Sequence, residues 1–446
     1  MTAHSERARQ LVHVSMGAFA LLLRYLTWWQ AALLAAAALT FNLLVLPRIG
    51  RRLYRPGELA RGVPAGIVLY PAAVLVLIVA FPARPDIAAA AWGILAAGDG
   101  LATLVGRAVR GPRLPWNPEK TVAGLAAFVL FGGIAGVLLA LWSRPAVHPA
   151  PAIGFSVIAP FAAAIAAGFV ESIPVRLDDN IAVPAAAAAV LWSGSIISPD
   201  LAANAPALVA ERLPLAIGLN AAAAAMGVAA RSVSGSGAIC GAIIGILIQV
   251  GSGVRGWVLL LITFLAATIS SRLGLRRKTL LGIAEERGGR RGPGNAIANT
   301  GIAAVAAVLS ILTPSRDLAL VAFVAALTAG ASDTLASEIG KAWGRRTYLL
   351  TGLRPVRPGT TGAVSMEGTL AGLAGAFGLA SAGIALGLIP AAALVPVVLG
   401  ATAGTYAESA LGATLEGPGI LNNDVLNFLN TTIAAVTAIV LMRVTG

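Results

Sequence analysis

Two sets of acidic, basic and hydroxyl side chains lie within strongly apolar sequence, and both sets have the same order along the chain. The first set comprises Gly98-Asp99-Gly100, Lys120-Thr121, Glu171-Ser172 and Asp178-Asp179-Asn180. The second set comprises Ser332-Asp333, Ser337-Glu338, Thr360-Thr361-Gly362, Glu367-Gly368, Glu408-Ser409 and Asn422-Asn423-Asp424. A charged group within a membrane segment is costly and is usually retained where it faces a cavity or a partner. The duplication therefore predicts two related sites.

The carboxylates of the first set are suited to binding a divalent cation. Asp99 and Asp179 are the candidate metal ligands, because Mg²⁺ typically takes one or two carboxylates together with phosphate oxygens. Gly98 and Gly100 would let a ligand or another backbone approach Asp99 closely.

The other members of the first set suit an anion and a proton transfer. Lys120 and Thr121 stand at the expected start of a helix, whose first amides are free to bind an anion. Glu171 is the candidate base for an alcohol proton. Asp178 and Asn180 either bind substrate or cap the helix that follows them.

In the second set, Asp333, Glu338 and Glu408 are the catalytic candidates, with Asp333 and Asp424 as metal ligands. Asp333 and Ser337 are four residues apart, so they share one face of a helix. This group is too polar to face lipid, which predicts a cavity there. Phosphate would be bound by arginines and hydroxyls in the loop that carries Arg354, Arg357, Thr360 and Thr361. The remaining candidates for binding substrate or nucleotide are Lys278, Arg290, Arg291, Asn295, Ser332, Lys341, Glu367 and Asn423.

The most basic loop of the chain contains Lys278, Arg290 and Arg291 and has two interpretations. It could close over a nucleotide or lipid phosphate, or it could be an orientation signal that touches anionic lipid heads. The sequence has no P-loop, no kinase-type catalytic loop and no His/Cys metal pattern, so any nucleotide would be bound by other means.

Composition places these sets in a membrane. The 446 residues are 58% hydrophobic and 11% charged, with a mean hydropathy of +0.85, whereas soluble domains are about 25% charged. We expect an all-α polytopic membrane protein with about 15 transmembrane helices and no cleavable signal. The expected spans are 11–27, 29–47, 65–82, 86–106, 121–142, 152–172, 180–197, 214–231, 236–252, 256–273, 295–313, 318–340, 366–388, 391–411 and 425–444.

The basic residues that give the net charge of +13 lie in four loops between spans: 48–64, 107–120, 272–294 and 341–365. Such a distribution indicates membrane orientation and argues against nucleic acid as a partner. It predicts that these loops, and the two sites beside them, face the cytoplasm of an inner-membrane-type bilayer. The single cysteine, Cys240, is expected to have a packing role.

The two sets lie eight spans apart, so both would have the same orientation. This predicts two parallel repeats, unlike the inverted repeats of many transporters. The expected organisation is a first membrane domain over 1–197, a linker over 198–214 and a second membrane domain over 215–446.

The first half resembles the polyprenol kinase family, which includes dolichol and phytol kinases. The matching residues are Arg9-Gln10-Leu-Val-His13, Tyr70-Pro71, Gly98-Asp99-Gly100 through Gly106, and Lys120-Thr121-Val-Ala-Gly124. The resemblance implies a CTP-dependent kinase that phosphorylates a long isoprenoid alcohol.

The second half resembles the family that contains phytyl phosphate kinases. The match runs through Ser236-Gly237-Ala238, Leu281 to Glu285, Gly289-Arg290-Arg291-Gly292, Asn295, Ala331 to Gly340, and Pro358 to Gly362. It implies transfer of a second phosphate to an isoprenyl monophosphate. Together the resemblances imply a bifunctional enzyme that uses Mg²⁺ and CTP or another nucleoside triphosphate. Two alternatives remain open: a CTP-dependent cytidylyltransferase that makes a CDP-lipid, and a transporter built from parallel repeats.

Overall fold

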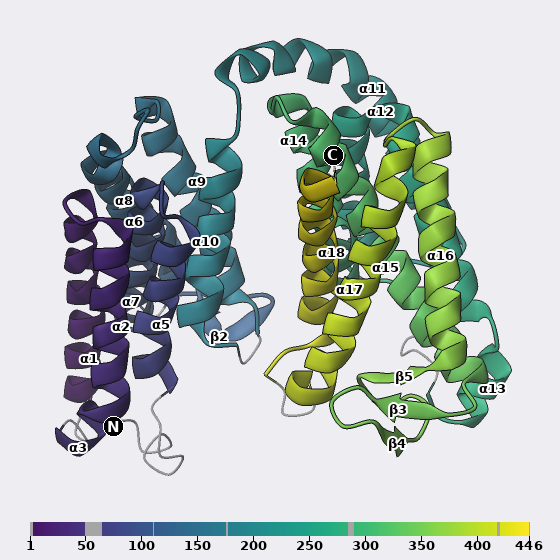
Figure 1. Ribbon diagram of the computed structural model, residues 1–446, viewed down its shortest axis with the longest axis horizontal. Helices are drawn as coiled ribbons and strands as arrows, with labels where there is room; N and C mark the ends of the chain where they lie inside the picture. The colour runs from purple at the N-terminus through teal and green to yellow at the C-terminus, as the bar shows by residue number, and fades with distance from the viewer. Residues whose placement is uncertain are drawn as a thin grey trace. The chain divides into compact units, whose positions relative to one another are not determined.

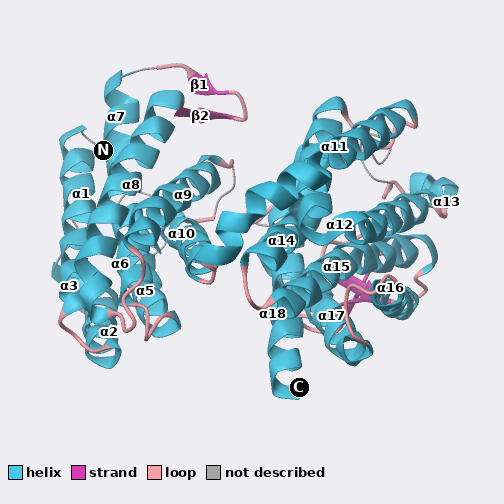
Figure 2. Ribbon diagram, turned by 90° about the horizontal axis from the view of Figure 1, so that it is seen from above, coloured by secondary structure: helices cyan, strands magenta, loops and turns pink. Residues whose placement is uncertain are grey.

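The computed structural model describes residues 3–49, 65–109, 111–174, 177–283, 290–416 and 420–445. It confirms an all-α polytopic membrane protein (Figures 1 and 2). Within those ranges, ten helices are long and apolar enough to cross a membrane, and Gln10–Arg24, Trp28–Leu44 and Ile67–Ala80 are shorter apolar helices. The chain divides into two compact units, Met1–Ile196 and Ile197–Gly446.

The first unit is a helical bundle with one small hairpin. Its helices are α1 (Ala3–Met16), η1 (Gly17–Arg24), α2 (Trp28–Leu44), α3 (Leu46–Ile49), α5 (Ala65–Ala80), α6 (Pro85–Gly93), η3 (Ile94–Asp99), α7 (Gly100–Val109), α8 (Val122–Ser143), η4 (Arg144–Ala146), α9 (Ile153–Ser172) and α10 (Asp179–Ser195). The hairpin pairs β1 (Arg113–Leu114) with β2 (Asn117–Thr121) in antiparallel register, Leu114 opposite Asn117.

The second unit is also a helical bundle, with a three-stranded sheet. Its helices are α11 (Pro199–Ala229), α12 (Gly235–Arg272), α13 (Leu275–Leu280), α14 (Pro293–Leu312), α15 (Arg316–Trp343), α16 (Met366–Ala385), η6 (Ala391–Ala393), α17 (Leu394–Leu411), η7 (Gly412–Glu416) and α18 (Asn423–Thr445). The sheet is antiparallel in the order β4 (Arg354–Val356), β3 (Thr347–Leu349), β5 (Ala363–Ser365).

Each of the fifteen expected ranges contains a helical segment, and α12 contains two of them. Gly253, in the middle of α12, has a φ of 73° and breaks the helix. The side chain of Cys240 contacts the carbonyl oxygen of Pro293, and the ring of Phe264 lies under Arg291, two residues away from Pro293. Residues 24 apart in a continuous helix are separated by about 36 Å. The chain therefore folds back at Gly253.

The connections differ from the expected ones. The expected linker 198–214 forms the first half of α11, and Arg212 binds the carbonyl oxygens of Val250 and Gly251 within the second unit. The loops 107–120 and 341–365 contain strands that the apolar pattern did not predict, because the strands are short and polar. Residues 50–64 and 284–289, which carry part of the basic loops, lie outside the described residues, as do the side chains of 3–9.

In each unit the helix that carries Asp99 or Asp333 is the central one. In the first unit this is the continuous run of α6, η3 and α7, and in the second unit it is α15. The most apolar stretches of Pro85–Val109 and Arg316–Trp343 are 67% and 72% buried, against at most 44% for any other candidate span. Both stretches are rich in alanine and glycine, which allow close helix packing. The hydrophobic cores of the two units form around these helices.

The same close helix crossing occurs in both units. Thr121 caps α8 and Ser365 caps α16, each accepting a hydrogen bond from a glycine amide three residues on, at 3.1 Å. Those glycines, Gly124 and Gly368, lie against the central helix of their unit. A Cβ at Gly368 would lie 2.5 Å from the carbonyl oxygen of Ala336, and one at Gly124 would lie 3.2 Å from that of Ala102. Ala102 follows Asp99 by three residues, and Ala336 follows Asp333 by three residues. The helix crossing therefore lies about one turn after the aspartate in both units.

This crossing gives a stability prediction. Gly368→Ala should lower the free energy of unfolding by about 1–3 kcal/mol, because the added methyl group overlaps a backbone oxygen. Gly378→Ala on the same helix is the matched control, since a Cβ there meets nothing within 4 Å. It should stabilise by up to about 1 kcal/mol through helix propensity. Thermal unfolding in detergent measures both, and equal changes would contradict the packing argument.

Candidate functional site

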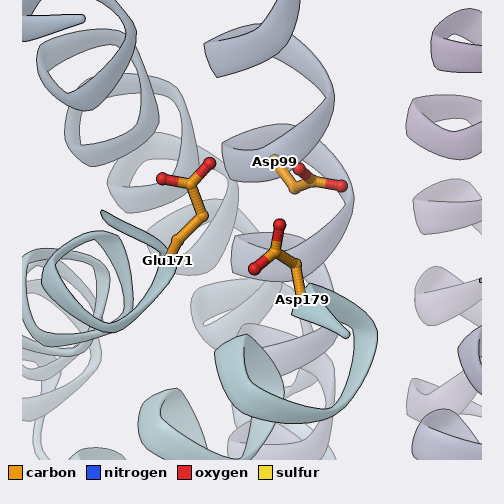
Figure 3. A group of neighbouring side chains, drawn as sticks. All are labelled: Asp99, Glu171 and Asp179. Atoms are coloured by element: carbon orange, nitrogen blue, oxygen red, sulfur yellow. The ribbon is translucent and has the colours of Figure 1, made fainter. Parts of the chain in front are cut away.

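Three carboxylates from three helices converge in the first unit. Asp99 ends η3, Glu171 is in the last turn of α9, and Asp179 begins α10 (Figure 3). One oxygen of each lies within 4.8 Å of the others, and in the part of the chain that the structure describes this is the one such group of three. Carboxylates brought this close repel one another unless a cation lies between them.

The backbone around Asp99 is unusual for a membrane helix. Ile94–Asp99 forms a π-helical turn between two α-helical segments, a feature often found at functional sites. The flanking glycines were expected to admit a ligand, but the structure uses both for helix packing. A Cβ at Gly98 would lie 2.9 Å from the ring of Phe128, and one at Gly100 would lie 2.4 Å from Val14. Neither glycine lines the cavity described below.

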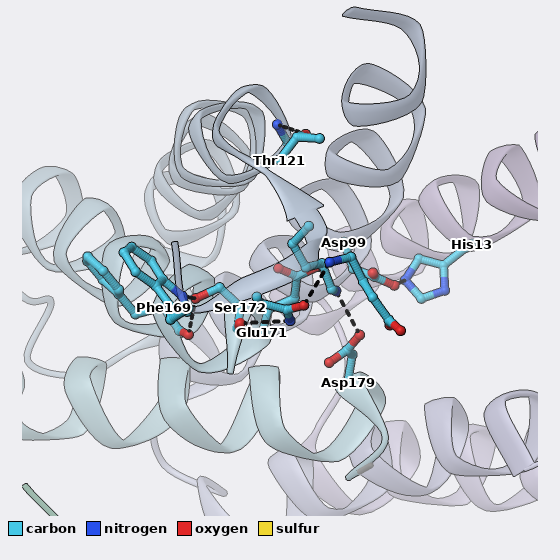
Figure 4. A network of polar contacts seen from close by, with 12 residues as sticks. His13, Asp99, Thr121, Phe169, Glu171, Ser172 and Asp179 are labelled. Carbon is cyan, nitrogen blue, oxygen red and sulfur yellow. Dashed lines mark hydrogen bonds and ion pairs between the residues drawn. The ribbon is translucent and has the colours of Figure 1, made fainter. Parts of the chain in front are cut away.

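The β1–β2 hairpin places Lys120 beside the carboxylates. Trp116 donates to the hydroxyl of Ser172, and Asn117 donates to the carbonyl oxygen of Ser172, both at 3.0 Å. These bonds fix the hairpin to the end of α9. Lys120 then forms an ion pair with Glu171 and lies 3.6 Å from Asp179 (Figure 4).

Lys120 is the cationic group among these acids, and its environment keeps it charged. Burial alone would lower the pKa of Lys120, but the carboxylates of Asp179 and Glu171 outweigh this effect, so the pKa is raised above its ordinary value. Lys120 therefore stays protonated throughout the neutral range. Three carboxylates outnumber this one lysine, and burial raises the pKa of Asp179 to about 7, so a bound cation would stabilise the ionised form of the cluster.

The neighbouring polar residues of the first set serve the local structure. Asp178 caps α10 by accepting hydrogen bonds from the backbone and side-chain amides of Asn180. Thr121 caps α8. All three residues still line the cavity, so their expected contact with substrate remains a prediction.

His13 joins the site from a distant part of the chain. Its Nε2 lies 3.4 Å from Oδ2 of Asp99, and its ring packs edge-on against Tyr70. The hydroxyl of Tyr70 accepts a hydrogen bond from Trp92 at 2.8 Å. His13 and Tyr70 were noted only as family matches. The signal that could have identified them is a histidine and a tyrosine within otherwise apolar spans.

A cavity of about 1820 Å³ surrounds this cluster. Its polar wall includes His13, Asp99, Lys120, Glu171 and Asp179. Most of its remaining wall is apolar and comes from α1, η1, α2 and α5. Such a cavity can hold a charged group at one end and a hydrocarbon chain along the rest.

The second unit has a related but different arrangement. The carboxyl groups of Asp333 on α15 and Glu408 on α17 lie beside each other and interact. Asn430, fully buried on α18, donates to Glu408 at 3.1 Å. Asp333 and Glu408 correspond in order to Asp99 and Glu171. Asn430 was not among the expected site residues.

Glu338 is enclosed by two lysines. Lys278 and Glu338, both 1% exposed, form an ion pair, and Lys341 binds the other oxygen of Glu338 at 2.9 Å. Lys278 also donates to the carbonyl oxygen of Ser271 at 2.7 Å. Glu338 is therefore fully occupied as an ion-pair partner, and its expected catalytic role would require these pairs to rearrange.

This buried pair gives a second stability prediction. Lys278→Met should lower the free energy of unfolding by about 3 kcal/mol, because removing one member of a buried pair leaves the other poorly compensated. Arg277→Met, at an exposed neighbouring position, is the control. Adding Glu338→Leu to Lys278→Met should recover part of the loss in thermal unfolding. A double variant less stable than the single one would contradict this account.

The other candidates of the second set are dispersed. Ser332 and Ser337 donate to carbonyl oxygens of their own helix. Asp424 packs against Gly294 in the first turn of α14, and Glu367 accepts a hydrogen bond from the amide of Arg345. Arg291 is tied by its backbone to Ser232 and Ser234 and lies over the ring of Phe264. The exposed candidates are Arg290, Arg354, Arg357, Thr360, Thr361 and Asn423, and Asn295 is half-buried at the start of α14.

Comparison with known proteins places the chain among membrane proteins. Residues 218–435 match the family model described as integral membrane protein DUF92. An uncharacterized membrane protein of Synechocystis sp. is 40% identical over 200 residues, covering 44% of this chain and 78% of that protein. The chloroplastic protein VTE6 of Arabidopsis thaliana is 37% identical over 218 residues, 47% of this chain and 66% of that protein. A rice protein named probable phytol kinase 2, chloroplastic, is 30% identical over 206 residues, 40% of this chain and 62% of that protein. No solved structure matches the chain.

Proposed function

The chain belongs to the DUF92 family of integral membrane proteins, and from this premise we propose that it is a bifunctional membrane phosphotransferase. Its first unit would phosphorylate an isoprenoid alcohol of the phytol or geranylgeraniol type. Its second unit would phosphorylate the resulting monophosphate to the diphosphate. The phosphoryl donor would be a nucleoside triphosphate, CTP by family resemblance, and both sites would face the cytoplasm.

One observation carries the first half of this proposal: the acidic cluster and a long apolar space form a single cavity. An isoprenoid alcohol has one reactive hydroxyl and a hydrocarbon tail, so it matches both ends. The names of similar proteins, among them probable phytol kinase 2, support a kinase acting on such a lipid.

The residues of the cluster fit Mg²⁺ as the cofactor. Carboxylate oxygens are its usual protein ligands. Asp99 and Asp179 would supply two of them, with the carboxylate of Glu171 within 4.8 Å of both. When bound, Mg²⁺ would neutralise charge on the phosphates of the nucleotide.

The chain's own residues would do the rest of the chemistry. Lys120 would exchange its carboxylate partners for phosphate oxygens of the nucleotide. That exchange would free Glu171 to accept the proton of the alcohol as the new oxygen–phosphorus bond forms and the bond to the nucleoside diphosphate breaks. Phosphoryl transfer depends mainly on positioning and charge neutralisation. A lysine on a hairpin that is hydrogen-bonded to the end of α9 can provide both.

The second unit has different charged residues near its site, as a different acceptor would require. When Asp99 is aligned with Asp333, Glu338 corresponds to Leu104 of the first unit. When Thr121 is aligned with Ser365, Val364 corresponds to Lys120. Lys278 and Lys341 add positive charge there. An acceptor that is already a phosphate needs cationic groups more than it needs a base. The pair Asp333 and Glu408 would hold the cation in this unit.

The test uses purified protein in detergent with prenyl alcohols and CTP labelled at the γ-phosphate. A kinase transfers the label to the lipid, first as monophosphate and then as diphosphate. A cytidylyltransferase would instead release the label as pyrophosphate and keep an α-label in the lipid. Lipid or ion flux in liposomes with no labelled product would indicate a transporter. Either of these results would overturn the proposal.

A further inference from the structure

The cavity of the first unit has a polar end and an apolar limb. The acidic cluster lies at the polar end, and the limb runs between η1, α2 and α5. The limb is lined by aliphatic and aromatic side chains, among them Leu22, Leu23, Leu26, Val74 and Ile78. Aliphatic lining of this kind recognises a hydrocarbon chain by its size and shape.

One face of α2 follows the limb along its length. Ala31, Leu34, Ala35, Ala38 and Phe41 all line the cavity, and their spacing places them on the same side of the helix. Three of the five are alanine, so the space beside α2 exists because the side chains there are small.

The direction of the limb follows from the contacts at its ends. Asn42 donates to the carbonyl oxygen of Ile67, and Tyr70, one turn further along α5, contacts His13 at the polar end. After the turn at 25–27, α2 runs back in the direction opposite to η1. Ala31, near the start of α2, therefore lies at the end of the limb that is far from the acidic cluster. Ala31 and Asn42 are eleven positions apart, which corresponds to about 16 Å at the helical rise.

The limb is closed in depth and open at the side. Leu23, Val74 and Ile78, on its deep wall, are at most 5% exposed. Phe19 and Leu34, at its rim, are at least 52% exposed. In a membrane, such an exposed apolar rim faces the hydrocarbon of the bilayer.

We propose that the alanine face of α2 determines which isoprenoid chain length the first unit accepts, with Ala31, Ala35 and Ala38 as specificity-determining residues. The substrate enters sideways from the bilayer between η1 and α2. Its hydroxyl is held at the acidic cluster, so the chain extends along α2 toward Leu26, which lines the cavity at the turn between η1 and α2. This inference rests on the proposed function, because the cluster fixes where the chain begins.

The test is a graded series of substitutions assayed with geraniol, farnesol and geranylgeraniol. Ala31→Phe, Ala35→Phe and Ala38→Phe place a ring progressively nearer the polar end. Each should lower kcat/KM for geranylgeraniol by at least about tenfold. Ala38→Phe should exclude farnesol as well, while geraniol is still phosphorylated. Ala37→Phe is the matched control, because Ala37 is exposed and does not line the cavity.

A second variant guards against misfolding caused by the added rings, because Ala31 and Ala35 are buried. Leu26→Ala removes side-chain volume at the far end of the limb and should move the preference toward longer chains. An unchanged length preference in both Ala38→Phe and Leu26→Ala would overturn the inference, even if the wild-type protein is an active kinase.

Binding separates this inference from the proposed function. Equilibrium binding of radiolabelled geranylgeraniol and geraniol is measured with the same variants in detergent. Selective loss of geranylgeraniol binding in Ala35→Phe supports the length determinant even where no phosphorylated product forms. In that case the kinase proposal alone fails. If wild-type protein binds neither alcohol, the length determinant is overturned.

Discussion

Asp99→Asn should strongly reduce phosphorylation of the prenyl alcohol while phosphorylation of the monophosphate continues. The carboxylate of Asp99 lies within 4.8 Å of those of Glu171 and Asp179, and it is the member that the central helix holds at a π-helical turn. Asparagine keeps the shape and removes the charge, so the cavity should survive and the cation should bind weakly. Losing one charge-stabilising group from such a site typically lowers kcat by about 10²–10³-fold.

The measurement follows label from γ-labelled CTP into each lipid, with alcohol and monophosphate supplied separately. Asp200→Asn serves as the control, because Asp200 is exposed and does not line the cavity of the first unit. Equal loss of both activities in Asp99→Asn would mean that one shared site does both steps. Unchanged alcohol phosphorylation would remove Asp99 from the site.

Asp333→Asn should have the opposite effect and cause prenyl monophosphate to accumulate. Asp333 lies on α15, the central helix of the second unit, where it occupies the place that Asp99 has in the first. Its carboxyl group interacts with that of Glu408 on α17. The amide has the shape of the carboxyl group, so folding should be little affected. We expect about a 10²–10³-fold fall in kcat for the second step.

The matched control for this variant is on the same helix. Asp317→Asn makes the same chemical change in the exposed first turn of α15 and should leave both steps intact. The time course with labelled alcohol is decisive. Diphosphate formed by Asp333→Asn at the wild-type rate would show that the second unit does not catalyse that step through Asp333.

The helical segments could be predicted from the sequence because they depend on local composition. Runs of apolar residues give the fifteen ranges, and Gly253 separates two of them where a helix-breaking φ is needed. Thr121 as a helix cap could also be predicted, since a hydroxyl at the start of an apolar run satisfies free amides. These features depend on neighbours within a few residues.

The pairings of the site could not be predicted because they join distant residues. Lys278 meets Glu338 across sixty positions, and His13 meets Asp99 across more than eighty. A sequence shows that a buried charge needs a partner, but it does not show which residue the fold supplies. Gly98 and Gly100 illustrate the same limit: their spacing around Asp99 favoured ligand contact, and their role is to pack against Phe128 and Val14.

The chain has three lysines, Lys120, Lys278 and Lys341, and each forms an ion pair with a carboxylate of a candidate site. Reagents that acylate amines therefore have no side-chain target away from these clusters. Their rate of modification at Lys120 and Lys341, the two that solvent reaches, would report whether each site is filled. Attaching the protein to a sensor surface through its lysine side chains would, for the same reason, block the reactions that the sensor is meant to follow.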